Sequence, residues 1–247
     1  MSEAVNNDLA DRPFDPRVIC ALDVPTADEA RALVERIGNA VGFYKIGLQL
    51  FASDGMALAR ELKASGAQIF LDWKLHDIGV TVEKATAVLA ESGCDLLTVH
   101  ARPQVMAAAA RGAAGSDLKI LGVTVLTSLT DEDLKADDHT LNAQQLVGLR
   151  VQQALDAGIH GVVSSPVEAA AAREAARIRG VDDFLVVTPG VRPLGADLND
   201  QMRIASPEAA LLGGATHLVI GRPITAASDP RAAARAITRE IARVCTG

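Results

Sequence analysis

The 247-residue sequence predicts a single (β/α)8 barrel, the TIM-barrel architecture of the α/β class. Short β-like runs alternate with longer helical patterns almost to the end of the chain, and eight such runs can be counted. Polar residues follow these runs all along the sequence, as expected where a barrel carries its active site. A doubly wound open sheet is the alternative. The even strand count and the polar strand ends favour the barrel, which we expect to span residues 17–247 after a loose arm at residues 1–16.

The expected strands are short runs that consist mostly of apolar residues. In chain order they are Arg17–Val24, Gly42–Gly47, Gln68–Lys74, Asp95–His100, Lys119–Val125, Gly161–Ser164, Phe184–Thr188 and His217–Gly221. The segments between them have helical spacing, as in Ala27–Ile37, where Thr26 and Glu29 form a capping-box signature, and in Ala143–Ala157. Glycines suited to helix C-termini precede most of the strands, namely Gly38, Gly66, Gly93, Gly115, Gly158, Gly180 and Gly214.

Three connections after expected strands stand out. Residues 129–140 are polar and acidic and predict an inserted loop or a short helix after the fifth strand. Pro189–Gln201, after the seventh strand, is long and contains Gly and Asn, which is typical of a flap that closes over a ligand. Gly221 ends the eighth expected strand and is followed by Arg222 and Pro223, and the proline is suited to the first turn of a helix.

The composition argues against several classes of partner. The net charge is −7 and aromatic residues make up 3% of the chain, which is unfavourable for a nucleic-acid platform. No apolar stretch is long enough to span a membrane, and the polar N-terminus does not resemble a signal peptide. The three cysteines, Cys20, Cys94 and Cys245, are widely spaced, which favours a reducing, cytoplasmic location.

The segment LDWKLHDIGVTV at residues 71–82 is the strongest functional signal. It places Asp72, Lys74 and Asp77 at the end of the third strand, and strand alternation puts Asp72 and Lys74 on one face. Trp73, between them, should then face the helices. Charged residues are depleted in strands and are rarely buried unless they are paired. The segment therefore predicts a catalytic site at the rim of the barrel.

Neighbouring strands end in further candidates for this site. Asp23 ends the first strand and Lys45 the second, so that two acids and two amines should meet near the third strand. A salt-bridge network that only closes the barrel is the structural alternative. Mg2+ between Asp72 and Asp77 is also conceivable, but the two lysines would occupy the same space as cations. We therefore expect no metal.

The other half of the rim predicts a phosphate site. Loops after the seventh and eighth strands often bind phosphate in such barrels, and here they carry Arg192, Gly221 and Arg222. A guanidinium group offers two parallel hydrogen bonds to phosphate, and a glycine allows close approach of the backbone. Thr127 and Ser128, in the segment VTVLTS, are further candidates at the end of the fifth strand.

Taken in order, these segments resemble the orotidine 5′-phosphate decarboxylase family from about Arg17 onward. The resemblance is carried by ALDVP, YKIG, LDWKLHDIGVTV, VTVLTS, VTPGVRP, Gln201 and IGRPIT. Bacterial members commonly read DLKFHDIPNTV in the third segment. This chain therefore departs from the pattern at Trp73 and at Gly79-Val80, while the charged positions and Thr81 are intact.

The resemblance implies a carboxy-lyase that converts orotidine 5′-phosphate to UMP and CO2 in pyrimidine biosynthesis, without a cofactor. It implies that Lys74 protonates C6, that Asp72 lies near the departing carboxylate and that Lys45 links the charged groups to the ribose. It also implies a homodimer with shared active sites, to which the partner subunit contributes Asp77 and Thr81. The implied substrate ligands are Asp23 for the ribose, Thr127 or Ser128 for the pyrimidine, and Arg192, Gln201, Gly221 and Arg222 for the phosphate.

Two other functions remain open from the residues. One is a Mg2+-dependent sugar-phosphate decarboxylase, aldolase or epimerase on the same barrel, because the D-x-K-x-x-D element is shared with related phosphate-sugar barrels. The other is a non-catalytic barrel that binds nucleotides. Dependence on Mg2+ would distinguish the first, and binding of UMP without release of CO2 would distinguish the second.

Overall fold

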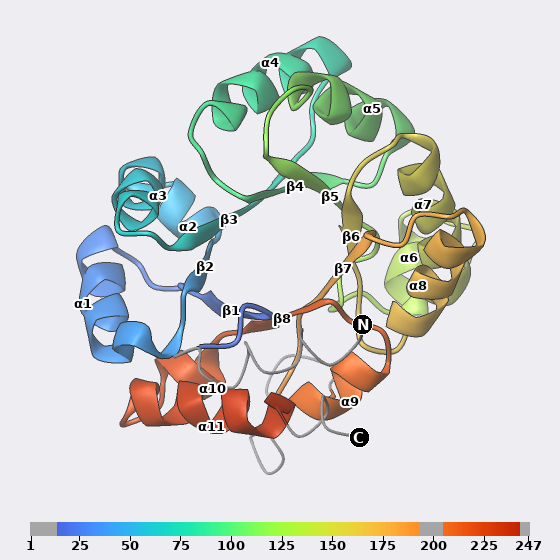
Figure 1. The fold of residues 1–247 in the computed structure, drawn as a ribbon. Coiled ribbons are helices and arrows are strands. Elements are labelled where there is room, and N and C mark those ends of the chain that lie inside the picture. Colours follow the sequence, from blue (N-terminus) through green and yellow to red (C-terminus); the bar gives the residue numbers. More distant parts are fainter. Residues whose placement is uncertain (1–13, 193–204, 243–247) are drawn as a thin grey trace, which may run out of the picture.

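The computed structural model describes residues 14–192 and 205–242, and in it eight parallel strands close into a barrel surrounded by helices (Figure 1). Each strand pairs with the next, and β8 pairs with β1. This confirms the predicted single-domain (β/α)8 barrel and excludes the open sheet. The strands are β1 Val18–Ala21, β2 Phe43–Ile46, β3 Gln68–Leu75, β4 Leu96–His100, β5 Lys119–Val123, β6 Gly161–Val163, β7 Leu185–Thr188 and β8 His217–Ile220.

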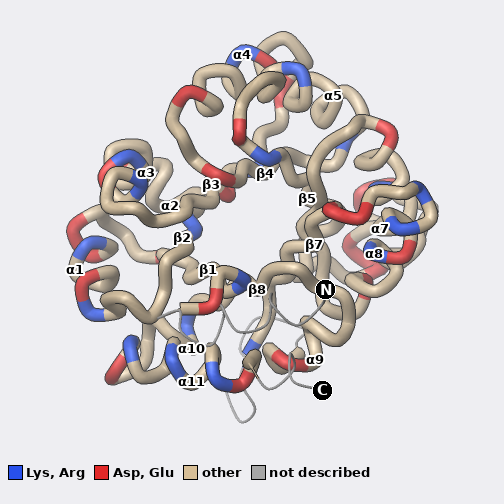
Figure 2. The backbone as a smooth tube through the Cα atoms, in the orientation of Figure 1, with Lys and Arg blue, Asp and Glu red and all other residues tan. Residues whose placement is uncertain are grey.

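Helices form the outer layer and connect the strands. They are α1 Ala27–Ile37, the 3-10 helix η1 Gly38–Ala40, α2 Leu48–Phe51, α3 Gly55–Ala64, α4 Gly79–Ala90, α5 Pro103–Gly112, α6 Asp131–Ala136, α7 Ala143–Asp156, α8 Ala169–Ile178, α9 Pro207–Leu212, α10 Arg222–Thr225 and α11 Pro230–Ala242. Most charged positions lie on this outer ring (Figure 2).

Local sequence signals account for many of the helix ends. The Thr26 hydroxyl accepts a hydrogen bond from the Glu29 backbone N–H at the start of α1, as predicted. The polar insertion after β5 forms the short helix α6, which begins at a capping box between Thr130 and Asp133. The seven glycines that were expected at helix C-termini all have positive φ.

Two apolar clusters hold the barrel together. The inner cluster comprises Ile19, Ala21, Phe43, Phe70, Leu96, Leu121, Val187 and Val219. The outer cluster joins the other face of the strands to the helices, and Trp73 packs there against Phe51 with ring centroids 4.5 Å apart. The prediction that Trp73 faces the helices is therefore confirmed. Because side chains alternate along a strand, the inner residues Phe43 and Phe70 are followed two positions later by Lys45 and Asp72.

Strand β3 departs from regular pairing where its charged residues lie. Its register with β4 moves from Leu71–Leu97 to Leu75–Val99, so β3 contains two more residues than β4 in this stretch. Within it, Lys74 has a φ of 51°, in the left-handed region that non-glycine residues rarely adopt. The irregular segment lies at the carboxyl end of the barrel, where it shapes the site.

The ends of the chain are described only in part. Of the predicted arm at residues 1–16, residues 14–16 are described: Phe14 packs closely against Gly42, and buried Asp15 pairs with Arg17 at 2.7 Å. Within the described residues, no helix is both long and apolar enough to cross a membrane.

Candidate active site

A cavity of about 530 Å³ opens at the carboxyl ends of the strands. This volume lies in the range typical of small-molecule sites. The cavity is lined by residues that follow strands on opposite sides of the barrel. Eight of the predicted site residues line it together: Asp23, Lys45, Asp72, Lys74, Thr127, Arg192, Gly221 and Arg222.

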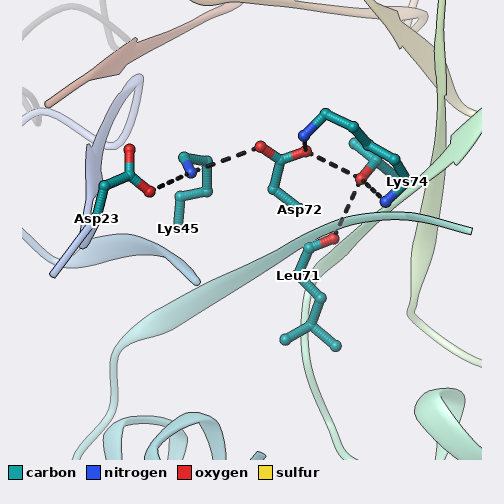
Figure 3. A network of polar contacts seen from close by, with 6 residues as sticks. Asp23, Lys45, Leu71, Asp72 and Lys74 are labelled. Atoms are coloured by element: carbon teal, nitrogen blue, oxygen red, sulfur yellow. Dashed lines mark hydrogen bonds and ion pairs between the residues drawn. The ribbon is translucent and has the colours of Figure 1, made fainter. Parts of the chain in front are cut away.

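Four of these side chains form a line of alternating charge along one wall, shown in Figure 3. The Lys45 ammonium lies 2.9 Å from the Asp23 carboxylate and 3.5 Å from the Asp72 carboxylate. The Lys74 ammonium lies 2.9 Å from the other oxygen of Asp72. Asp23 is the most exposed of the four and Lys45 the least, with 60% and 9% of the side chain accessible. The line therefore runs from a solvated end into a buried centre.

The buried members of this line stabilise each other in their charged forms. Burial favours the neutral form of Lys45, but the charges of Asp72 and Asp23 outweigh it and raise the lysine's pKa above its ordinary value. Burial likewise raises the pKa of Asp72, yet Lys45, Lys74 and hydrogen bonds from Lys74 and Thr98 lower it overall. The cavity therefore contains fixed ammonium and carboxylate groups at neutral pH.

Thr98 of β4 holds the irregular end of β3 and was not identified from the sequence. Its hydroxyl oxygen accepts a hydrogen bond from the Lys74 backbone N–H at 2.9 Å and lies 3.0 Å from Asp72 Oδ1. The only sequence signal is a threonine within the apolar run LLTVH. The positions of Asp72 and Lys74 thus depend on a neighbouring strand as well as on their own.

Gly47 is a second residue that the sequence did not identify. A Cβ at this position would lie 2.9 Å from Asp23 Oδ1 and 3.0 Å from Lys45 Nζ. Its φ of −88° is open to any residue, so space rather than backbone conformation favours glycine here. The absence of a side chain at Gly47 leaves room for the Asp23–Lys45 pair.

The loops after β7 and β8 carry the predicted phosphate ligands. Arg192 follows β7 and is 8% exposed, and its backbone N–H donates to the carbonyl of Ala205 at 2.9 Å. Arg222 is the first residue of α10, with Pro223 in the first turn, as predicted for the segment after β8. The Gly221 carbonyl accepts hydrogen bonds from two N–H groups of α10, which fixes the turn that presents Arg222.

The remaining predicted residues do not line this cavity in a single chain. Asp77 and Thr81 are exposed at the start of α4, and Asp77 lines a separate shallow depression on the outer surface. Ser128 is exposed, whereas its neighbour Thr127 faces the cavity. Gln201 and most of the predicted flap at Pro189–Gln201 lie outside the described residues.

The chemistry available at this site is that of fixed charges. Among the described residues, no group of three or more His, Cys, Asp or Glu side chains is arranged to bind a metal ion. The Lys74 ammonium can donate a proton into the cavity and can stabilise negative charge that develops beside it. Arg192 and Arg222, which follow β7 and β8, can bind an anion. The cavity therefore suits a small phosphorylated substrate.

Comparison with known proteins agrees with this geometry. The family model for "Orotidine 5′-phosphate decarboxylase / HUMPS family" matches residues 16–237. Orotidine 5′-phosphate decarboxylase from Caulobacter vibrioides is 63% identical over 230 residues, which cover 93% of this chain and 99% of the relative. The corresponding enzyme from a Methylobacterium species is 52% identical over 235 residues, with 93% and 98% covered.

Solved structures show the same relationship. The crystal structure of orotidine 5′-phosphate decarboxylase from Lactobacillus acidophilus superposes with a TM-score of 0.79 at 36% sequence identity, and covers 92% of this chain and 99% of that one. A conserved protein from Geobacillus kaustophilus superposes with a TM-score of 0.76 at 32% identity, covering 91% and 99%. Both the sequence match and the structural match extend over nearly the whole barrel, and this chain belongs to the orotidine 5′-phosphate decarboxylase / HUMPS family.

Proposed function

We propose that this chain is a carboxy-lyase that converts orotidine 5′-phosphate to UMP and CO2 as a cytoplasmic step of pyrimidine biosynthesis, without a metal or cofactor. The relatives with the highest identity given above carry this activity in their names. The observation that carries the proposal is the placement of the Lys74 ammonium, fixed 2.9 Å from Asp72, in the same cavity as Arg222. A nucleotide with its phosphate at Arg222 would present its base to Lys74.

Lys74 is the proposed proton donor. As the bond between C6 and the carboxylate breaks, its electron pair stays on C6 and CO2 leaves. The Lys74 ammonium stabilises this negative charge and then transfers a proton to C6, which leaves a neutral amine that regains its proton from solvent. Asp72 keeps the ammonium in place before the reaction, so little reorganisation is needed in the transition state.

The other residues of the cavity bind the rest of the nucleotide. Asp23, more exposed than the other charged groups of its wall, would accept a hydrogen bond from a ribose hydroxyl, with Lys45 beside it. Thr127 would contact the edge of the pyrimidine, a role that its position in the cavity favours over exposed Ser128. Arg192 and Arg222 would bind the phosphate, together with the backbone of Gly221 and with Gln201. Such remote binding energy can be expressed in the transition state at C6.

A homodimer with shared sites is the proposed assembly. Asp77 and Thr81 lie on a segment where Ile78 and Val80 are 69% and 56% exposed. Phe51 of α2, which packs against Trp73 of β3, is also half exposed. Exposed apolar side chains on neighbouring elements are typical of a protein interface. Docking of this surface against a second copy would bring Asp77 and Thr81 to the partner's cavity.

The ultraviolet assay for conversion of orotidine 5′-phosphate to UMP tests the function. We expect turnover that is unchanged by EDTA and that is abolished in Lys74→Ala, although this variant remains folded. Activity that is lost in EDTA and restored by Mg2+ would instead favour a metal-dependent barrel enzyme. Binding of UMP without release of CO2 would favour a non-catalytic binding protein.

Mixed dimers test the shared site. Asp72→Ala and Asp77→Ala subunits, each inactive alone, should form some active sites when they are mixed, because one site then contains both native carboxylates. Size-exclusion chromatography with differently tagged subunits measures the fraction of mixed dimers. If mixed dimers form and no activity returns, the two carboxylates belong to one subunit's site.

A further inference from the structure

We propose that Thr98 is a positioning residue for the decarboxylation, which sets the Lys74 backbone and the Asp72 carboxylate through a single hydroxyl group. The inference rests on the proposed roles of Lys74 and Asp72. Thr98 has no accessible surface, so it acts through these two residues rather than on the substrate itself.

The hydroxyl of Thr98 both accepts and donates a hydrogen bond. Its oxygen accepts a hydrogen bond from the Lys74 backbone N–H at 2.9 Å. Its one proton can go to Asp72 Oδ1 at 3.0 Å or to the Leu71 carbonyl at 3.5 Å, and the shorter distance and the negative charge favour the carboxylate. One side chain therefore connects the backbone of the proposed proton donor to the carboxylate that holds its ammonium.

The irregular pairing of β3 explains why this support is needed. The paired residues of β3 and β4 go from Leu71–Leu97 directly to Leu75–Val99. Lys74 therefore lies in a stretch of β3 that has no paired residue in β4. At this point Lys74 has a φ of 51°, a conformation that persists only where its surroundings favour it. The Thr98 hydroxyl supplies the hydrogen bond that a regular strand would have supplied.

The same hydroxyl also orients the Asp72 carboxylate. Oδ1 accepts hydrogen bonds from both Thr98 and the Lys74 ammonium, at 3.0 Å and 2.9 Å. This leaves Oδ2 directed to Lys45, 3.5 Å away. Loss of the hydroxyl would remove one of the two groups that fix Oδ1 and would leave a buried N–H without a partner. Both changes would allow the Lys74 ammonium to move away from its working position.

Three variants test the inference. Thr98→Val replaces the hydroxyl with a methyl group of similar size, and Thr98→Ser keeps the hydroxyl. Thr86→Val is the matched control, since Thr86 is equally buried and its hydroxyl has no hydrogen-bond partner among the described residues. We expect Thr98→Val to lower kcat about 10- to 100-fold with less than about a 3-fold change in KM, because the lost interaction positions groups that act in the transition state. Thr98→Ser should recover most of kcat, and Thr86→Val should resemble the unmodified enzyme.

A crystal structure of Thr98→Val supplies a second measurement. We expect a changed Lys74 φ and a longer distance from Lys74 Nζ to Asp72 Oδ1. Should Thr98→Val fail to fold, Thr98→Cys, a weak hydrogen-bond donor of similar size, takes its place with an intermediate loss of kcat expected. A kcat within about 2-fold of the unmodified enzyme in the variant that folds, or a Thr98→Ser kcat no higher than that of Thr98→Val, would overturn the inference. That result together with an inactive Lys74→Ala rejects only the role of Thr98, whereas an active Lys74→Ala rejects the proposed mechanism.

Discussion

Replacement of Asp72 by Asn removes one charge from the centre of the alternating line and preserves the size of the side chain. The carboxylate of Asp72 lies 2.9 Å from the Lys74 ammonium and 3.5 Å from the Lys45 ammonium. At an effective dielectric constant of about 20, these distances correspond to attractions of roughly 6 and 5 kcal/mol. Desolvation of the carboxylate offsets part of this sum. Removal of one partner from a buried pair typically destabilises a protein by about 3–5 kcal/mol.

The expected result is a large loss of both stability and activity. A destabilisation of about 3–5 kcal/mol corresponds to a Tm lower by about 6–20 °C in a chain of this size. We expect kcat to fall at least about 100-fold, because the Lys74 ammonium loses the group that fixes it. Glu61→Gln is the control: the same chemical change breaks an exposed pair with Arg31 at 2.9 Å and should leave Tm unchanged. Thermal melts by circular dichroism and the ultraviolet assay measure the two effects.

The difference in Tm between the unmodified protein and Asp72→Asn should depend on pH, which provides an independent check. The pKa of Asp72 in the folded protein lies below its ordinary value of 3.8, so its stabilising pairs are complete above that value and are lost as the pH falls through the folded-state pKa. The Tm difference between unmodified protein and Asp72→Asn should therefore be constant near neutral pH and should narrow in acid. A difference below about 2 °C at pH 7, or one that persists undiminished in acid, would refute the assigned role of Asp72.

Three other changes probe different parts of the cavity. Gly47→Ala should fold but lower kcat/KM about 10-fold, because the new Cβ would displace the Asp23 carboxylate from Lys45; a crystal structure that retains this pair at 2.9 Å would contradict the explanation. Arg222→Ala should weaken the binding of UMP at least about 10-fold in calorimetry but leave uridine binding unchanged, whereas equal losses for both ligands would place Arg222 outside the phosphate site. Cys20 should resist alkylation at pH 8 until the protein is unfolded in urea, because burial, and secondarily Asp23, raise its pKa to about 12; rapid labelling of the native protein, followed by mass spectrometry, would contradict this.

The sequence predicted those features that depend on local pattern and on strand polarity. Asp23 and Lys45 each follow a buried apolar run, and the carboxyl ends of parallel strands in a barrel meet at one rim. Their convergence could therefore be inferred without coordinates. The start of α1 was predictable at Thr26 for a similar reason, because the hydrogen bond from the Glu29 N–H to the Thr26 hydroxyl joins residues only three positions apart.

Features that depend on packing between distant segments were not predictable in the same way. Alternation along β3 correctly placed Asp72 beside Lys74, but the two meet through a shifted register and a positive φ rather than a regular pleat. That geometry depends on Thr98, 24 residues further along the chain. The role of Gly47 likewise follows only from the space around it. The proposed contribution of Asp77 would come from a second chain and stays a prediction.

The backbone of Lys74 has a consequence for the balance between durability and catalysis. A left-handed conformation at a non-glycine residue costs roughly 1–2 kcal/mol, which glycine at the same position would not incur. Lys74→Gly should therefore yield a protein that melts at a higher temperature than Lys74→Ala, although neither would turn over substrate. Relative to the native lysine, however, glycine would remove the ammonium that lies 2.9 Å from Asp72, so the same ion pair that fixes the proposed proton donor also offsets the cost of its backbone.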